Sequence, residues 1–382
     1  MKAIFAHDHR FLLDRNGFAY SKGKIKKESF DLYLSYFDSV SVISRYDVEN
    51  DSSTLKSMEA INDIDYIDFI PFKNLSTPKE LLNCNNLELM CEKIKGHDFL
   101  IARLPSEIGL LAIKAARKLK IKYTIEFVAC PWDALWNYGG IRSKLYAPFY
   151  YVRNRMATTH ANSVSYVTSS FLQRRYPSNG IKVGVSDVVI DTESNYRVKR
   201  VLDRNKVINI GLIGSLDSPH KGIGDAIKAV GILLEKGCKI NLNLLGPGDI
   251  SIWKKQCESF SDYVNFCGIR NPGKDVQEWL ARQDIYIQPS LQEGLPRAII
   301  EAMNCGLPII GSNAGGIPEL VNQKFIHPKK DYIRLSDLIL YILTEENEYE
   351  AMSEYSLRIS ERYVKNNLDK VRNEFWDSIL KV

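Results

Sequence analysis

The run of residues from 293 to 321 carries the clearest chemical signal in the sequence. It reads EGLPRAIIEAMNCGLPIIGSNAGGIPELV and follows DIYIQPS, which has the pattern of a buried strand. Gly294 frees the backbone, and Pro296 has the φ preferred at a first helical position, so we expect a helix to begin there. The unpaired N–H groups and the dipole of that helix start form an anion site suited to phosphate. Glu293 in the loop and Glu301 in the helix flank this site.

A second phosphate-binding signal lies at residues 214–227, GSLDSPHKGIGDAI. Gly214 ends a strand pattern, a polar loop follows, and Lys221 with Gly222 opens the next helix. A lysine at a helix start adds a full positive charge to the helix dipole. Two helix starts and one ammonium group that meet at a cleft suit a diphosphate held without a metal ion. We therefore expect Gly214 and Lys221 to lie beside the run that starts at Glu293.

Alternating strands and helices must position these turns. Strand patterns occur at residues 1–6, 98–104, 122–128, 207–214, 239–246, 264–268, 284–290 and 307–312. Helical patterns occur at 110–116 and 222–236. This order predicts parallel sheets with helices on both faces, and in such sheets ligands bind outside the carboxyl ends of the strands.

A polar stretch at residues 191–206 divides the chain and is interpreted as a hinge. The fold class predicted is α/β, with two doubly wound Rossmann-like domains at 1–190 and 207–365 and a cleft between them. The last helix, within 366–382, has one apolar face. It packs either on its own domain or back on the first domain.

The pairing of HKG (220–222) with the run 293–321 resembles the donor-binding half of the family 4 retaining glycosyltransferases of GT-B fold. The chain is similar to bacterial polysaccharide-type members. The resemblance implies a nucleoside-diphosphate sugar as donor, a saccharide or lipid-linked acceptor, no cofactor and no metal ion. It also implies a role in cell-surface polysaccharide biosynthesis. Configuration at the sugar would be retained, with the departing phosphate accepting the acceptor's proton on the same face.

The same resemblance assigns roles to individual residues. Lys221 would neutralise the diphosphate and Glu293 would contact the transferred sugar, so these two are the expected catalytic residues. Glu301 would bind the ribose hydroxyls, and Arg270 would lie near the base. The remaining donor contacts would come from Gly214, from a flexible loop at Gly17, and from backbone amides at Gly294, Leu295 and Pro296.

The sequence departs from the family pattern at two places. Ser215 occupies a position where many members carry an arginine, so phosphate charge would rest on Lys221 together with Arg270 or Arg297. Many members also place a histidine near the reacting carbon in the first domain. After the strand at 122–128 this chain has residues 129–133, ACPWD, instead.

Three charged residues follow first-domain strands at positions expected to face the cleft: Arg103, Glu126 and Asp133. Each either orients the acceptor or serves catalysis, or it forms an ion pair in a loop. His7, His9 and Arg10 follow the first strand, where a structural or acceptor-contacting role is favoured over metal ligation because no partner cluster supports a metal. Asp63-Ile64-Asp65 resembles a metal-binding DxD motif, but its alternation with apolar residues favours the exposed face of an edge strand.

Positive charge is concentrated in one window. Between Ala134 and Ser186 there are seven basic residues and no Asp or Glu. Within it, residues 141–156, IRSKLYAPFYYVRNRM, mix basic and aromatic side chains, a pattern typical of binding to an anionic membrane surface. The alternative is a helix with aromatic residues in the core and solvated charges, and Pro148 indicates a break or a new helix start. Nucleic acid is not an expected partner, because no base-reading module is present.

Composition and spacing weigh against other classes of protein. Apolar residues make up 45% and charged residues 25%, as in globular chains, and the seven scattered cysteines indicate reduced thiols. With no secretory signal pattern, we expect a cytoplasmic protein, with peripheral attachment at the inner face of the plasma membrane. A hydrolase is disfavoured because its carboxyl pair lies roughly 5–9.5 Å apart, whereas eight helical residues span about 12 Å. The open alternatives are a nucleotide-sugar isomerase or epimerase of the same fold and a non-catalytic sugar-nucleotide-binding subunit.

Overall fold

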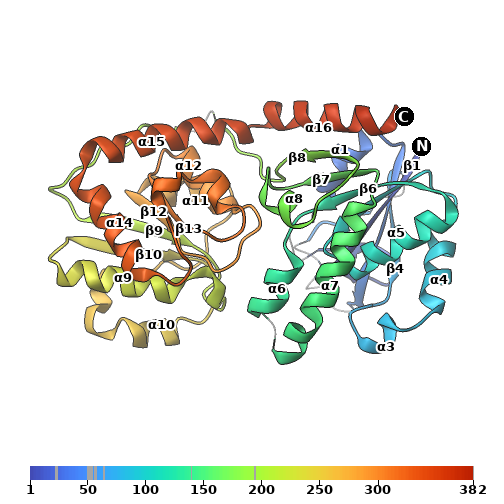
Figure 1. Cartoon of the computed structure of the whole chain (residues 1–382), viewed down its shortest axis with the longest axis horizontal. Coiled ribbons are helices and arrows are strands. Elements are labelled where there is room, and N and C mark those ends of the chain that lie inside the picture. Colours follow the sequence, from blue (N-terminus) through green and yellow to red (C-terminus); the bar gives the residue numbers. More distant parts are fainter. Residues whose placement is uncertain are drawn as a thin grey trace.

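Two parallel sheets, each covered by helices, make up the protein (Figure 1). The computed structural model describes residues 1–21, 25–49, 55, 58–62, 65–138, 140–192 and 195–381. Asp63 and Ile64 of the DxD-like segment lie outside the described residues. Asp65 lies in a bend before the edge strand β4, so the edge-strand interpretation does not hold for it. It holds for Asp68, which is exposed between buried Ile67 and Phe69 on β4.

The first sheet has the strand order β4-β3-β1-β5-β6-β7-β8, with β2 paired to β1. The strands are β1 (Lys2–Leu13), β2 (Ala19–Tyr20), β3 (Ser39–Val48), β4 (Ile67–Phe72), β5 (Phe99–Leu104), β6 (Lys122–Phe127), β7 (Ser163–Tyr166) and β8 (Ile181–Gly184). The helices are α1 (Asp31–Leu34), α3 (Pro78–Leu81), α4 (Asn85–Ile94), α5 (Glu107–Leu119), α6 (Pro131–Tyr138), α7 (Ile141–Thr159) and α8 (Phe171–Arg175). Apolar cores lie on both faces of this sheet.

The second sheet has the order β11-β10-β9-β12-β13-β14. The strands are β9 (Ile208–Ile213), β10 (Ile240–Leu245), β11 (Val264–Phe266), β12 (Ile285–Gln288), β13 (Ile309–Ser312) and β14 (Ile326–His327). The helices are α9 (Ile223–Glu235), α10 (Ser251–Gln256), α11 (Lys274–Ala281), α12 (Arg297–Asn304), α13 (Ile317–Leu320), α14 (Tyr332–Thr344), α15 (Glu346–Ser360) and α16 (Lys365–Leu380). The predicted α/β class, with two doubly wound sheets, is confirmed.

Several elements differ from the sequence-based expectations, and strands β7, β8 and β14 are not among the expected ones. β1 runs to Leu13, well past the predicted segment 1–6, because its pairing with β3 resumes after a bulge between Ala6 and Arg10. β3 was not predicted, although its alternating Ser and Val residues suit a strand with one buried face. Pro148 neither breaks nor starts a helix but lies inside the continuous helix α7.

The C-terminal helix α16 packs on the first domain (Figure 1). Trp376 lies in ring contact with Tyr36, Phe37 and Phe99 of that domain. The chain enters the second domain beside the point where it returns, since Ile190 forms a parallel bridge with Val364. Of the two alternatives for the last helix, the structure therefore shows the crossing back onto the first domain.

Candidate active site

The two phosphate-type turns meet at the carboxyl edge of the second sheet. The short 3-10 turn η2 (Pro219–Lys221) follows β9, and its His220 carbonyl accepts a hydrogen bond of 2.7 Å from the Leu291 amide beyond β12. Gly222 has φ +73°, and a Cβ at this position would lie 2.0 Å from the Pro289 carbonyl oxygen. Only glycine fits here, so the predicted convergence of the two turns is confirmed.

Lys221, in the first of these turns, contacts Glu293 in the second. Its side chain lies over Gly214, where a Cβ would come within 2.9 Å of Lys221 Cγ. Nζ then donates to Glu293 Oε1 at 2.7 Å, with the two side chains 24% and 10% exposed. An ammonium group has three donors, so Lys221 can hold Glu293 and still donate to an oxyanion. A freely solvated lysine is therefore ruled out.

Glu293 is fixed by a polar chain that runs into the sheet. Ser290 Oγ donates to Glu293 Oε1 at 2.8 Å, and Gln288 donates to the same oxygen at 3.4 Å. Gln288 Oε1 in turn accepts from the Tyr286 hydroxyl at 2.7 Å. Burial raises the pKa of Tyr286, and the Glu293 and Glu301 carboxylates raise it further, so this phenol remains a donor. The carboxylate is thus preorganised before any ligand binds.

The helix after Glu293 begins one residue later than predicted. Pro296 is the N-cap of α12, and Arg297 is its first residue. Our expectation that Pro296 offers a backbone amide is wrong, because proline has no N–H. The amides of this turn belong to Gly294, Leu295 and Arg297. Glu301 lies in the second turn of α12 and is half-buried.

Glycines let the strand ends next to these side chains pack closely together. A Cβ on Gly246 would lie 2.0 Å from the Gly214 carbonyl oxygen, and the Gly246 amide donates to the Gly268 carbonyl at 2.8 Å. The ends of β9, β10 and β11 therefore approach more closely than larger residues allow. Gly246 was missed, although its place at the end of a strand pattern is a usable signal. Arg270 comes two residues after Gly268 and is exposed.

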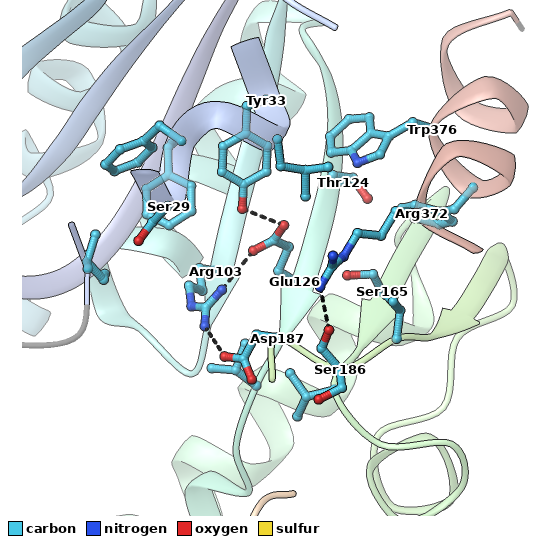
Figure 2. A pocket seen from close by; sticks show the side chains of 18 of the residues that line it. Ser29, Tyr33, Arg103, Thr124, Glu126, Ser165, Ser186, Asp187, Arg372 and Trp376 are labelled. Atoms are coloured by element: carbon cyan, nitrogen blue, oxygen red, sulfur yellow. Dashed lines mark hydrogen bonds and ion pairs between the residues drawn. The ribbon is translucent and has the colours of Figure 1, made fainter. Parts of the chain in front are cut away.

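The first domain contributes a second cluster of charged side chains (Figure 2). Arg103, at the end of β5, pairs with Glu126 of β6 at 3.1 Å and with Asp187 at 2.9 Å. Tyr33 donates to the other Glu126 oxygen at 2.7 Å. Burial raises the pKa of Tyr33, and Glu126 raises it further, so the phenol keeps its proton. Arg103 and Glu126 thus lie together, whereas Tyr33 and Asp187 were missed because each comes from a distant segment.

These side chains line a cavity of about 380 Å³. Its wall is completed by Arg297 at the start of α12 and by Arg372, Phe375 and Trp376 of α16. Figure 2 shows Arg372 and Trp376 reaching in from the C-terminal helix, with Arg372 bound to the Ser186 carbonyl. The cavity therefore lies between the carboxyl edge of the first sheet and the helix start that follows Glu293.

Other first-domain candidates lie elsewhere. Asp133 is buried in α6 and pairs with Arg175 at 2.9 Å, so the ion-pair alternative holds for it. Gly17, with φ +87°, lies in the turn of the β1–β2 hairpin, where its carbonyl accepts from Asn62. No contact recorded among the described residues joins Gly17 to Lys221 or Glu293.

His7 and His9 have structural partners. His7 Nδ1 lies 3.1 Å from the Arg103 carbonyl oxygen, and His9 Nε2 lies 2.8 Å from Ser21 Oγ. Burial, reinforced by the charge of Arg103, lowers the pKa of His7 to about 3, so its ring is neutral at pH 7. Within the described part of the chain, no three His, Cys, Asp or Glu side chains are grouped to hold a metal ion.

The two domains are fastened directly beside the cavity. Glu319 of α13 accepts hydrogen bonds from the amides of Ser169, Ser170 and Phe171, at 2.6, 3.1 and 2.5 Å. Gly294 lies so close to Val128 that a Cβ would be 3.0 Å from its carbonyl oxygen. The segment after β6 therefore approaches the donor-side turn, although it lacks the histidine that the family pattern places there.

The GT-B fold consists of two α/β domains whose parallel sheets face each other with their carboxyl edges. In this protein the chain crosses between the domains twice, and the C-terminal helix returns to the first domain. Solved structures agree: HepE from Anabaena in complex with UDP has a TM-score of 0.67 at 16% identity. The lipopolysaccharide outer core galactosyltransferase WaaB has a TM-score of 0.70 at 15% identity. Each comparison covers 100% of both chains.

Sequence relatives carry the identification further. Residues 208–345 match the family described as glycosyl transferases group 1. Protein CapJ from Staphylococcus aureus is 30% identical over 395 residues, covering 98% of each chain. The amylovoran biosynthesis glycosyltransferase AmsK from Erwinia amylovora is 33% identical over 173 residues, which are 42% of this chain and 41% of its own. The protein belongs to the group 1 glycosyl transferases and is a transferase enzyme.

Proposed function

We propose that the protein transfers a sugar from a nucleoside diphosphate to a saccharide or lipid-linked acceptor in the assembly of a cell-surface polysaccharide. The observation that carries this proposal is the meeting of Lys221 and Glu293 at the start of α12. Further support comes from relatives: HepE was solved with UDP and with UDP-glucose, and AmsK is named for amylovoran biosynthesis.

The proposed chemistry follows the charge that develops during transfer. The bond between the sugar's anomeric carbon and the phosphate oxygen breaks, which leaves negative charge on the diphosphate and positive charge on the ring. Lys221 and the amides of Gly294, Leu295 and Arg297 stabilise the diphosphate, with no metal ion or cofactor in this scheme. Glu293 holds the sugar hydroxyls, Glu301 the ribose hydroxyls, and Arg270 lies toward the base.

In the same scheme the acceptor binds in the cavity beside Arg103 and Glu126. Its hydroxyl oxygen bonds to the anomeric carbon on the face that the phosphate leaves, and its proton passes to the departing phosphate oxygen. Configuration is therefore retained without a covalent enzyme intermediate. Because the leaving group accepts the proton, this route does not depend on the missing histidine.

The decisive variant is Lys221→Ala, with Lys239→Ala as a matched control at the exposed residue before β10. Loss of one preorganised charged donor is expected to lower kcat about 100- to 1,000-fold. Glu301→Ala should likewise abolish transfer through weaker nucleotide binding. The measurement is product formation with a panel of nucleotide sugars and acceptors, after a calorimetric screen of nucleoside diphosphates identifies the base.

Two outcomes would contradict the proposal. Full transfer activity in both Lys221→Ala and Glu301→Ala would show that this turn is not the donor site. Conversion of the donor to a new nucleotide sugar in the absence of any acceptor would instead identify an isomerase.

A further inference from the structure

Helix α7 exposes a continuous apolar stripe. Five large side chains recur at helical spacing along one face: Ile141 (79% exposed), Leu145 (76%), Phe149 (57%), Val152 (49%) and Met156 (56%). Residues at such spacing lie above one another on a helix. An apolar surface of this length on one element is unusual for a surface that meets only water.

The opposite face of α7 is anchored, so the helix cannot turn to bury the stripe. Glu107 of α5 is buried, accepts from the Tyr146 hydroxyl at 2.6 Å, and pairs with Arg153 at 2.8 Å. Ala147 and Asn154 are also buried on that side. Arg153 is thus a structural residue and not one of the solvated charges that the sequence pattern suggested.

Basic and aromatic groups flank the stripe. Arg142 and Lys144 are exposed, and Lys144 Nζ lies 6.0 Å from the ring centre of Trp136, which is itself exposed on α6. No acidic residue occurs between Ala134 and Ser186 to offset these charges. Apolar side chains beside lysine, arginine and tryptophan match the acyl boundary and the headgroups of an anionic lipid layer.

The stripe also lies close to the site of chemistry. α6 packs against α7 on the side that faces the second domain (Figure 1). Its Asn137 donates to Gln292 at 3.1 Å, and Gln292 is the residue before Glu293. Any binding partner that contacts α7 therefore lies beside the turn that we assign to donor binding.

We propose that the exposed face of α7, together with Trp136, docks the protein on an anionic lipid surface and so brings the cavity to acceptors held in that surface. The delivery of the cavity to acceptors rests on the proposed function, whereas the docking on lipid does not. A second copy of this chain is a poorer occupant, because a symmetric contact through this face would bring the positive charges of Arg142 and Lys144 from the two copies together.

The first test is co-sedimentation of the full chain with vesicles of phosphatidylcholine alone and with vesicles that also contain phosphatidylglycerol. We expect binding only to the anionic vesicles. Ile141→Ser with Leu145→Ser should weaken that binding about 100-fold, since two large apolar groups no longer enter the lipid. The matched control is Ile252→Ser with Ile333→Ser, which removes two large exposed apolar groups (68% and 58% exposed) from the second domain and should bind as the parent does.

The second test removes charge instead of apolar surface. Arg142→Gln with Lys144→Gln should weaken binding to the anionic vesicles roughly 30-fold, whereas Lys254→Gln with Lys255→Gln on α10 should not. A parent chain that stays in solution with both kinds of vesicle would overturn the proposal. So would a dimer in sedimentation velocity that Ile141→Ser with Leu145→Ser converts to a monomer.

Nucleotide binding separates this proposal from the proposed function. Both α7 variants should bind the preferred nucleoside diphosphate as tightly as the parent, because Lys221 and Glu293 are untouched. If the protein binds vesicles but no nucleotide, the proposed function is contradicted and the lipid-docking proposal is supported. If it binds nucleotide but no vesicles, the lipid-docking proposal is contradicted and the proposed function is supported.

Discussion

At the scale of residues, the two carboxylate clusters differ in what holds them. Glu293 accepts from one ammonium group, that of Lys221, and from the neutral side chains of Ser290 and Gln288. Glu126 is held by Tyr33 and by Arg103, which pairs in turn with Asp187. The first arrangement prepares one carboxylate and one ammonium group for a ligand. The second fixes an arginine inside a cavity, where its charge is balanced and its position is set by two acids.

Glu126→Gln tests whether this second cluster positions the acceptor. Arg103 would lose one of its two anionic partners, and a small displacement in the cavity is expected to lower kcat/KM for the acceptor about 10- to 100-fold. The dissociation constant for nucleotide should not change, because the donor turn is untouched. Steady-state kinetics with varied acceptor and calorimetry with nucleotide measure the two quantities.

A half-buried ion pair outside the cavity supplies the control for that experiment. Asp133→Asn removes the charged partner of Arg175 and is expected to cost about 1.5–3 kcal/mol of stability, which chemical denaturation will report. Its acceptor KM should stay near the parent value. Equal kinetic defects in Glu126→Gln and Asp133→Asn would assign the Glu126 effect to general loss of packing.

At the scale of elements, the donor site depends on turns that follow parallel strands. β9 and β12 are neighbours in the sheet, so the segments after them emerge side by side. Each turn is short, and glycine lets the two backbones approach to contact at Gly222 and Pro289. The backbone geometry of the two turns therefore determines where the side chains of the site can lie.

Gly222→Ala tests the closeness of those turns. The new Cβ would meet the Pro289 carbonyl oxygen, so the turn that carries Lys221 must shift and nucleotide affinity should fall at least about tenfold. Gly237→Ala is the matched control, since Gly237 also has positive φ, +80°, but no atom lies within 4 Å of a Cβ there. That control should cost only about 1–2 kcal/mol of stability. Equal nucleotide affinity in the two variants would mean that turn contact is unimportant.

At the scale of the whole molecule, covalent and noncovalent connections tie the domains together. The chain crosses twice at the Ile190–Val364 bridge, α16 returns to the first domain, and Glu319 caps the segment that leads into α8. The first two keep the domains attached in any arrangement. Asn137 and Glu319 also form hydrogen bonds between the domains. Glu319 binds three backbone amides through one carboxylate, which makes it suited to hold a closed arrangement.

Glu319→Gln should favour a more open arrangement of the domains. Hydrogen bonds to a charged acceptor contribute about 1.5–3 kcal/mol each, and an amide group cannot accept from all three backbone donors. The expected result is a larger radius of gyration by small-angle X-ray scattering, with added nucleotide reversing part of the change. Glu348→Gln, which breaks an ion pair with Lys324 inside one domain, should leave the radius unchanged. No difference between the two variants would contradict this role.

The sequence by itself determined the parts of the protein that are local. The strand–turn–helix units around Lys221 and Glu293, the two parallel sheets and the basic aromatic helix follow from periodicity, glycine placement and charge within short windows. One miss was also local in cause, because Pro296 was assigned an N–H that it lacks. The extension of β1 instead depends on pairing with β3 beyond a bulge.

Only the tertiary structure decided which side chains meet. The cavity combines Tyr33, Arg103, Glu126, Asp187 and Arg372, which the chain brings together from segments up to hundreds of residues apart. It also buried Asp133 beside Arg175, paired Arg153 with buried Glu107, and left the apolar stripe of α7 outside. The physical reason is that periodicity reports which face of an element is apolar, whereas the partner of a charged side chain depends on how distant elements pack.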